Sequence, residues 1–257
     1  MKTNNFKHFL IAGLVSCGIA AALTSCEKDN YDEPEAGIEG VIIDSTTGLP
    51  LETAAGKGSM QMRIWESSWA QNDTTINVNP QDLNMRQDGT FANYKLFAGE
   101  YRIVPFQGAF YPLDEEEYKT VKLSNGKTTK VEFTVTPYLT LEWVREPYQD
   151  GDTIKCAVRF TRNAGNGPMP DIQNMQMLVS HTQYVPGADG QVTPNALQPG
   201  PGEDQINNDK EGQTIELKSL PIKYSNRYWI RVSAKCNDAY KKDNYTSIKT
   251  IDVTVNH

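Results

Sequence analysis

Residues 228–235 read Tyr-Trp-Ile-Arg-Val-Ser-Ala-Lys, with mostly apolar side chains at one parity and mostly polar ones at the other. Successive side chains of a β-strand point to opposite faces, so this stretch predicts a strand with one dry face and one wet face. The same alternation recurs at residues 130–135, Lys-Val-Glu-Phe-Thr-Val. The two stretches therefore predict β-structure in both halves of the chain.

The rest of the chain repeats this pattern between short turn-forming segments such as Gly48-Leu49-Pro50 and Asp88-Gly89. No long segment has the apolar spacing of a helix. Antiparallel β-sandwiches produce such alternation, because each sheet packs one face against its partner and exposes the other to water. We therefore expect an all-β fold built from antiparallel sandwiches.

A proline marks the expected boundary between two domains. One alternating stretch ends near Thr136 and Pro137, and a new one begins at Leu139. Proline lacks the N–H that a central strand needs, so it is typical of a strand end. We expect two β-sandwich domains in tandem, at residues 37–137 and 138–257.

The chain begins with a basic segment followed by an uncharged, largely apolar run, residues 9–25, which is typical of a secretory signal peptide. Leu23-Thr24-Ser25 lead directly into Cys26, the arrangement that a lipoprotein signal peptidase recognises. We expect residues 1–25 to be removed and Cys26 to carry lipid. Two alternatives fit less well: a cut before Cys17 leaves apolar residues on the mature end, and a transmembrane anchor needs roughly 20 apolar residues.

Residues 26–36 follow as an acidic segment with too little apolar surface to fold, and we interpret them as a flexible tether. An acidic patch behind the lipidated cysteine resembles the surface-export signal of Bacteroidetes lipoproteins. The expected location is the outer membrane, anchored by lipid and exposed at the cell surface. The membrane is then a partner through the N-terminal lipid.

Charge excludes one class of partner. Removing residues 1–25 takes away two lysines and no acidic residue, which changes the formal net charge from −7 to −9. A surface of that sign repels nucleic acid, so we expect no nucleic-acid partner. Twelve Tyr, eight Phe and four Trp supply enough bulk for a hydrophobic core.

Two cysteines, Cys156 and Cys236, remain in the folded part, and both lie at inward parity. That parity permits a disulfide bond. Counting along the expected strands puts the two residues four positions out of step, or ~13 Å at ~3.3 Å per residue. The reach of a disulfide is ~7 Å, so buried thiols are the default and pairing stays open.

Four segments in the first half carry a resemblance. They are residues 38–44 (Ile-Glu-Gly-Val-Ile-Ile-Asp), 47–51 (Thr-Gly-Leu-Pro-Leu), 88–91 (Asp-Gly-Thr-Phe) and 96–101 (Leu-Phe-Ala-Gly-Glu-Tyr). Their order resembles the carboxypeptidase regulatory-like, or transthyretin-like, β-sandwich. The resemblance implies that fold for residues 37–137.

A longer set of segments, residues 88–91, 96–103, 108–110 and 133–138, resembles an uncharacterised Bacteroidetes lipoprotein family. Members are commonly encoded beside outer-membrane nutrient importers of the starch-utilisation (Sus-like) type. The likeness covers most of the mature chain and is strongest over residues 38–160. It implies an accessory role in polysaccharide utilisation.

The second half contains Leu220-Pro221 followed by the strand at residues 228–234. This region is similar to the F strand of fibronectin type III domains with its corner tyrosine, although the spacing is looser. The similarity implies an immunoglobulin-like sandwich for residues 138–257.

Catalytic signals are weak. The mature chain has two histidines, His181 and His257, and neither lies in a recognisable catalytic motif. The acidic run Asp114–Glu117 reads as a solvated loop, and the acidic stretch at residues 203–211 reads the same way, with a loosely held calcium as a remote alternative. We expect no enzyme activity, no metal and no cofactor.

Aromatic side chains supply the candidate ligand-binding residues, because sugars stack their C–H faces on exposed rings. Parity turns Trp65 and Trp229 outward, and Trp69 follows in a loop. Trp143 shares the parity of core residues. Cover by a neighbouring loop is the alternative role of each outward tryptophan.

Phe110 and Tyr111, close to Phe106, are a second aromatic candidate, with packing between the domains as the alternative. Residues 186–213 are rich in Pro, Gly, Asn and Asp and exceed the usual loop length, so they could arch over a ligand or contact an importer.

These features lead to one functional prediction and two alternatives. We expect a non-catalytic cell-surface lipoprotein, accessory to outer-membrane glycan import, that captures a glycan or braces the importer complex. A structural or adhesive envelope lipoprotein is the first alternative. A hydrolytic protein, or one associated with a glycoside hydrolase, is the second.

Overall fold

The structure is a computed structural model that describes residues 33–54, 60–70, 73, 75–185 and 206–255. The expected signal peptide, Cys26 and most of the tether lie outside these residues. In the described part of the chain, no helix has the length and apolar character needed to cross a membrane. Contacts group Pro34–His257 into one compact unit.

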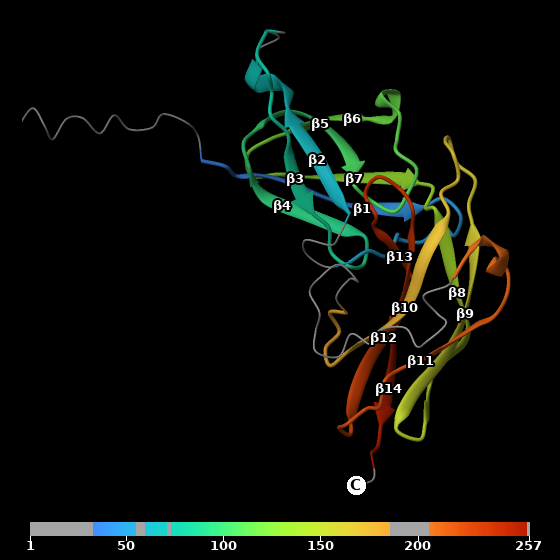
Figure 1. Cartoon of the computed structure of the whole chain (residues 1–257). Helices are drawn as coiled ribbons and strands as arrows, with labels where there is room; N and C mark the ends of the chain where they lie inside the picture. Colours follow the sequence, from blue (N-terminus) through green and yellow to red (C-terminus); the bar gives the residue numbers. More distant parts are fainter. Residues whose placement is uncertain (1–32, 55–59, 71–72, 74, 186–205, 256–257) are drawn as a thin grey trace, which may run out of the picture. The chain divides into compact units, whose positions relative to one another are not determined.

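Before Pro137, the described residues form seven strands and two short 3-10 helices. They are β1 (Ala36–Asp44), β2 (Gln61–Glu66), η2 (Ser67–Ala70), β3 (Gln81–Asn84), β4 (Thr90–Leu96), β5 (Gly99–Phe106), η3 (Glu115–Glu117), β6 (Lys119–Leu123) and β7 (Thr128–Val135). They form two sheets, ordered β4-β1-β7 and β3-β2-β5-β6 (Figure 1). We call this group the N-terminal sandwich.

One hydrophobic cluster joins the two sheets of the N-terminal sandwich. Ile38 and Phe133 contribute to it from one sheet, and Met62 and Ile103 from the other. All four side chains are at most 3% exposed. Alternation therefore works as predicted here, with one face of each sheet in the core and the other toward water. The pair of β1 with β7, in the first of these sheets, is parallel.

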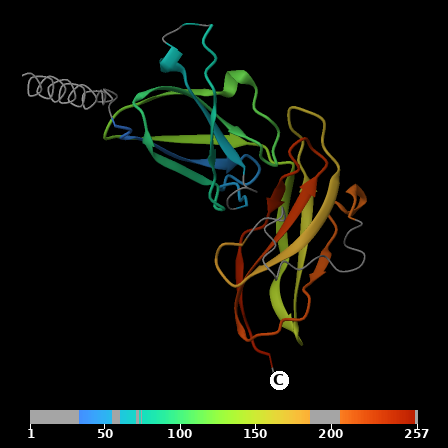
Figure 2. The ribbon, with the colours of Figure 1, turned by 60° about the vertical axis from the view of Figure 1, so that its left-hand side comes forward.

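In the described part of the chain after Pro137, seven further strands and a 3-10 helix follow. They are β8 (Leu139–Asp150), β9 (Thr153–Arg162), β10 (Ile172–Ser180), η5 (Asn208–Lys210), β11 (Ile215–Lys218), β12 (Asn226–Cys236), β13 (Asp243–Tyr245) and β14 (Lys249–Val253). One sheet has the order β11-β9-β8, and the other has the order β10-β12-β13 with β14 also paired to β12. Figures 1 and 2 show this C-terminal sandwich as one group of strands, coloured yellow-green to red. The all-β prediction is confirmed.

Strand pairing respects the position of Pro137. Strands β1–β7 pair with one another, and so do β8–β14, while Pro137 itself forms an isolated bridge with Phe110. The domain boundaries at residues 37–137 and 138–257 stay predictions.

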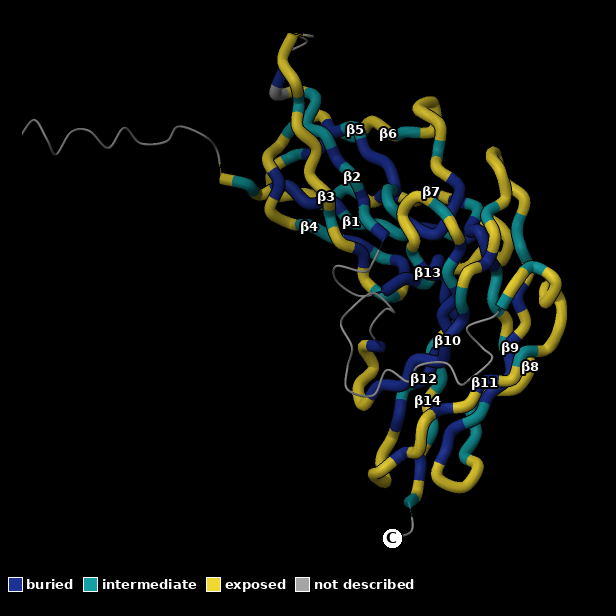
Figure 3. Tube along the Cα trace, in the orientation of Figure 1, coloured by how far each residue is buried: buried dark blue, intermediate teal, exposed yellow. Residues whose placement is uncertain are grey.

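The outward face of β12 differs from the prediction of a wet face. Arg231 and Ser233 are both 0% exposed, although parity places them opposite the core residues of their strand. Ala54, Leu178, Val185 and Tyr245 form a separate hydrophobic cluster, which Trp229 packs against. Figure 3 shows β12 buried along much of its length. A strand pattern identifies two faces but not whether another segment covers the second one.

Cys156 and Cys236 are buried at 2% exposure each, and no disulfide bond joins them. They lie on strands of different sheets, β9 and β12. Buried thiols, the default of the sequence analysis, are what the structure contains.

Candidate functional site

The outward face of the sheet β3-β2-β5-β6 carries arginines and aromatic rings. Met62 and Ile64 of β2 point into the core and are 0% and 1% exposed. Arg63 and Trp65 alternate with them along the strand, so they point outward. Trp65 pairs with Arg102 of β5 across the ladder. The outward position expected for Trp65 is the position that the structure gives it.

Two strands and a loop bring three of these side chains together. The rings of Trp65 and Tyr118 are nearly parallel, with an interplanar angle of 15° and centroids 6.0 Å apart. The Arg102 guanidinium carbon lies 4.4 Å from the Tyr118 centroid and 5.8 Å from that of Trp65. Such contacts hold a cation and aromatic rings in a fixed relation.

A second group continues along the same face. The Arg63 guanidinium carbon lies 3.5 Å from the Phe106 ring centroid, and Tyr240 meets Phe106 edge-on at 5.4 Å. We call the outward residues Arg63, Trp65, Arg102, Phe106 and Tyr118 the aromatic–arginine surface.

Val104 shows that this surface is closely packed. Ile103 faces the core, so Val104 faces outward, yet its side chain is only 3% exposed. It pairs with Arg63 across the ladder and lies between Arg102 and Phe106 on β5. Val104 is therefore an apolar, buried position within this surface.

Each arginine of the surface is paired with a carboxylate. Arg63 donates two hydrogen bonds to Asp82, at 2.7 and 2.8 Å, and this bonding raises the pKa of Arg63 above its ordinary value. Arg102 pairs with Glu115 of η3 at 3.1 Å. The pairs lower the net charge of the surface and leave donors and acceptors beside the apolar rings.

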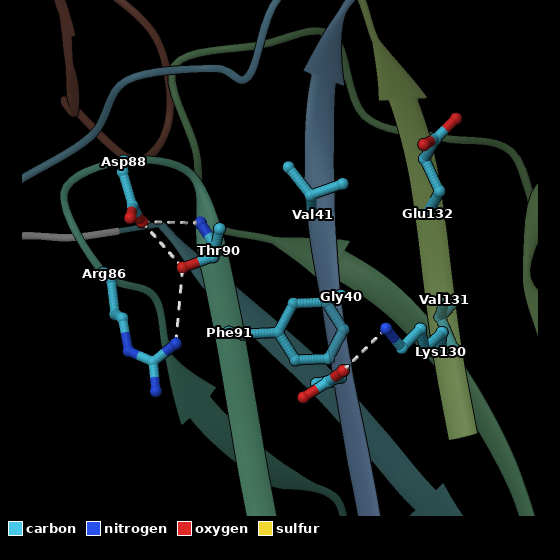
Figure 4. Close-up of a pocket in the computed structure, with 10 residues that line it drawn as sticks. Gly40, Val41, Arg86, Asp88, Thr90, Phe91, Lys130, Val131 and Glu132 are labelled. Carbon is cyan, nitrogen blue, oxygen red and sulfur yellow. Dashed lines mark hydrogen bonds and ion pairs between the residues drawn. The ribbon is translucent and has the colours of Figure 1, made fainter. Parts of the chain in front are cut away.

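A hollow of about 570 Å³ lies on the outward face of the other sheet of the N-terminal sandwich (Figure 4). We call it the Glu39 hollow. Its lining residues are Glu39, Gly40, Val41, Arg86, Asp88, Thr90, Phe91, Lys130, Val131 and Glu132. This volume is within the usual range of small-molecule sites.

The turn before β4 shapes one wall of the hollow. Gly89 has a φ of 75°, which glycine adopts without strain. The Asp88 carboxylate accepts hydrogen bonds from the Thr90 backbone N–H at 3.1 Å and from its hydroxyl at 2.7 Å. Arg86 approaches the same hydroxyl at 3.5 Å. Figure 4 shows these three side chains together on one side, across β1 from Lys130 and Glu132.

Tyr94 lies beside the hollow on the outward face. Its hydroxyl donates to Glu39 Oε2 at 2.8 Å, and Lys130 pairs with the same carboxylate at 3.4 Å. These two contacts, the tyrosine bond first, lower the pKa of Glu39 below its ordinary value. The Tyr94 side chain is 52% exposed.

The remaining aromatic candidates lie elsewhere. Trp69 belongs to η2, but its side chain is outside the described residues. Trp229 is half-buried against the cluster around Leu178. Phe110 and Tyr111 are 3% and 4% exposed and belong to hydrophobic clusters, so their rings offer a ligand little surface.

Two further residues have structural contacts. Trp143 is half-buried at the edge of the C-terminal core, and its indole N–H donates to the Ser247 backbone oxygen at 3.0 Å. His181 is exposed and lies against the Tyr228 ring at 4.8 Å. Within the described residues, no three His, Cys, Asp or Glu side chains are grouped so that they could hold a metal ion.

Sequence analysis identified Trp65 but missed its partners. Tyr118 follows η3, and Arg102 is on β5, so only the strand register brings them to Trp65. Arg63 and Arg102 share the outward parity of their strands with Trp65 and Phe106, which is the signal that could have identified them. The Glu39 hollow has no comparable signal in the sequence.

Comparison with known proteins finds a family model that matches the N-terminal sandwich. Residues 36–136 match the model described as "Protein of unknown function (DUF3823) N-terminal domain". No match was found among the curated proteins.

Three crystal structures resemble the chain, and each comparison covers 86% of this chain and 100% of the other. A DUF3823 family protein from Bacteroides uniformis ATCC 8492 has a TM-score of 0.67 and 24% identity. A second protein from that organism, described as a "putative carbohydrate binding protein", has a TM-score of 0.66 and 18% identity. A DUF3823 family protein from Parabacteroides merdae ATCC 43184 has a TM-score of 0.64 and 21% identity.

At these identities the likeness shows a shared fold over most of the chain. The resemblance to an uncharacterised family is confirmed for the N-terminal region, whereas association with importers and lipidation stay predictions. Residues 36–136 are thus similar to the N-terminal domain of the DUF3823 family.

Proposed function

We propose that the protein binds glycan, without catalysis, through the aromatic–arginine surface. The observation that carries this proposal is the arrangement of Trp65, Tyr118 and Arg102 on an open sheet face. Near-parallel rings stack on the C–H face of a pyranose, while arginine and carboxylate groups at their edges bond the hydroxyls.

The carboxylates of this surface support binding rather than hydrolysis. Asp82 and Glu115 each pair with an arginine of the surface, at 2.7 and 3.1 Å. A glycosidase needs one carboxyl group that donates a proton and one that acts as nucleophile or base. Carboxylates held by arginines instead orient the hydrogen-bond donors. The structurally similar protein described as "putative carbohydrate binding protein" supports the same ligand class.

The wider role is part of the proposal. We propose that lipid on Cys26 anchors the protein at the outer-membrane surface, where it assists an importer by capturing glycan or bracing the complex. The signal-like residues 1–25 support this role. Radiolabelled palmitate should enter the wild type and not the variant Cys26→Ser, and an importer should co-purify in mild detergent. Absence of label from the wild type would contradict the anchor, and recovery of the protein alone would contradict bracing.

Affinity gel electrophoresis tests glycan binding. The wild type is run through gels that contain starch, xylan, glucomannan or pectin, and at least one should retard it. Trp65→Ala should weaken that retardation at least about tenfold, or about 1.4 kcal/mol, because the stacking ring is lost. Trp65→Phe keeps a ring and should retain part of the binding.

The matched control removes an exposed ring elsewhere. Tyr224 is 68% exposed in the C-terminal sandwich, so Tyr224→Ala should migrate as the wild type does. Melting temperatures measured in parallel separate lost binding from lost folding. Equal retardation of wild type and Trp65→Ala, or no retardation in any gel, would contradict the proposal.

A further inference from the structure

We propose that the Glu39 hollow, with the adjoining Tyr94 ring, is a second binding site for a neutral glycan. The N-terminal sandwich would then bind glycan on both of its outward faces. The ligand class rests on the proposed function, while the site stands on its own contacts.

A glycine fixes the position of the Tyr94 ring. A Cβ on Gly37 would lie 3.1 Å from Tyr94 Cδ1, which is closer than ordinary packing allows. The ring therefore packs directly on the β1 backbone, in space that the glycine leaves. Its hydroxyl bond to Glu39 at 2.8 Å restrains the other end of the side chain. Tyr94 is thus a restrained ring that stays 52% exposed, as a stacking platform requires.

Donors and acceptors line the hollow on both sides. Asp88 and Arg86 lie at one wall, and Lys130 and Glu132 at the other, over the apolar side chain of Val41 (Figure 4). A sugar hydroxyl donates and accepts at once, so it can satisfy both kinds of group. Val41 offers an apolar surface for the ring C–H groups.

The charged residues that line the Glu39 hollow favour a neutral ligand. An anionic sugar would meet the carboxylates of Glu39, Asp88 and Glu132, and a cationic one would meet Arg86 and Lys130. Glu39 is already neutralised by Lys130 at 3.4 Å. A neutral polyhydroxylated ligand avoids repulsion from either set of charges.

The two sites point in opposite directions. The sheets that carry them share one hydrophobic cluster between them, so their outward faces point away from each other. One glycan residue cannot contact both faces. Two sites on one protein can instead hold two chains, or two parts of one long chain, and retention on a polymer then exceeds that of either site alone.

Isothermal titration calorimetry with a short oligosaccharide counts the sites. The probes are maltohexaose, xylohexaose and cellohexaose, beginning with the one that corresponds to the polysaccharide that retards the protein. The wild type should bind two molecules per chain. Trp65→Ala and Tyr94→Ala should each bind one, and the double variant none.

Two more variants separate the ring from its hydrogen bond and from a fold defect. Tyr94→Phe keeps the ring and loses the bond to Glu39, so the hollow should still bind, but more weakly than in the wild type. Tyr224→Ala removes a tyrosine of the C-terminal sandwich that is even more exposed than Tyr94, and should leave the count at two. Circular dichroism confirms that each variant is folded.

The outcomes distinguish the two proposals. One molecule bound by the wild type and none by Trp65→Ala would overturn the second site and leave the proposed function standing. One molecule that survives Trp65→Ala and disappears in Tyr94→Ala would place binding in the hollow alone. An uronic-acid oligosaccharide that binds the hollow better than the neutral probes would overturn the ligand class. No binding of any probe would overturn both proposals.

Discussion

Arg231 donates a hydrogen bond from Nη1 to the backbone oxygen of Thr53 at 2.8 Å, across 178 positions of sequence. Its Nη2 donates to the Val185 backbone oxygen at 2.6 Å, and its guanidinium carbon lies 3.9 Å from the Tyr245 ring centroid. The side chain is 0% exposed. One buried cation thus ties the segment after β1 to the sheet that contains β12.

Arg231→Ala should therefore destabilise the protein strongly. The substitution leaves two buried carbonyl oxygens without their donor and opens a cavity, so the free energy of unfolding should fall by about 3–5 kcal/mol. Urea denaturation measures this change, provided that the slope of the unfolding free energy against urea concentration is the same in both proteins. Arg231→Lys should recover little, because one ammonium group cannot reproduce the two-armed geometry.

Arg227 is the control on the same strand. It makes a two-bond pair with Asp252 at 2.8 and 2.9 Å, but both side chains are more than half exposed. Arg227→Ala should leave the free energy of unfolding nearly unchanged, because water screens exposed pairs. Similar losses for Arg227→Ala and Arg231→Ala would contradict the anchoring role.

Glu52 should make stability depend on pH. Burial raises the pKa of Glu52 from 4.5 to about 7. The positive charge of Arg231 opposes this rise, and the negative charge of Asp88 adds to it. The folded protein binds the carboxyl proton of Glu52 more tightly than the unfolded chain does. The stabilisation that results is fully present below the pKa of glutamate in the unfolded chain, about 4.3. It is lost as the pH rises through about 7.

Glu52→Gln removes this titration. Between about pH 5 and about pH 8, the unfolding free energy of the wild type should fall by about 1–2 kcal/mol more than that of the variant, after allowing for partial contact with water. Glu142→Gln, at an exposed position of β8, makes the same charge change and should follow the wild type. Parallel curves for Glu52→Gln and the wild type would refute the assignment.

The two buried cysteines should resist alkylation. Burial raises the pKa of the Cys236 thiol to about 12, so almost none of the reactive thiolate is present at neutral pH. Iodoacetamide followed by peptide mass spectrometry should modify neither Cys156 nor Cys236 in the native protein, and both in concentrated guanidinium without a reductant. Modification after unfolding only when a reductant is added would reveal a disulfide bond instead.

Alternation of side chains predicted the fold because it reflects burial directly. Val131, Phe133 and Val135 are buried as expected, and the polar neighbours of Phe133, Glu132 and Thr134, are exposed. The same rule failed at Arg231, because a distant segment covers that face. Whether another segment covers the outward face of a strand depends on long-range contacts, which a local sequence pattern does not show.

The candidate surface was predictable to a similar extent. Parity turned Trp65 outward, but its contact with Tyr118 depends on the register of three strands and on the loop that holds η3. Phe110 and Tyr111 were proposed because they lie close to Phe106 in the sequence, with packing between the domains as the alternative, and the structure buries both. A group of aromatic residues in the sequence indicates close packing as readily as a ligand site.

The most direct measurement is the response of the tryptophan indole N–H signals, in a two-dimensional NMR spectrum, to the glycan that retards the protein. The chain has four tryptophans, and Trp65→Phe assigns the signal of Trp65. The Trp65 signal should shift on addition of glycan while those of Trp143 and Trp229 stay in place. Saturable glycan binding that leaves the Trp65 signal unmoved would contradict the account.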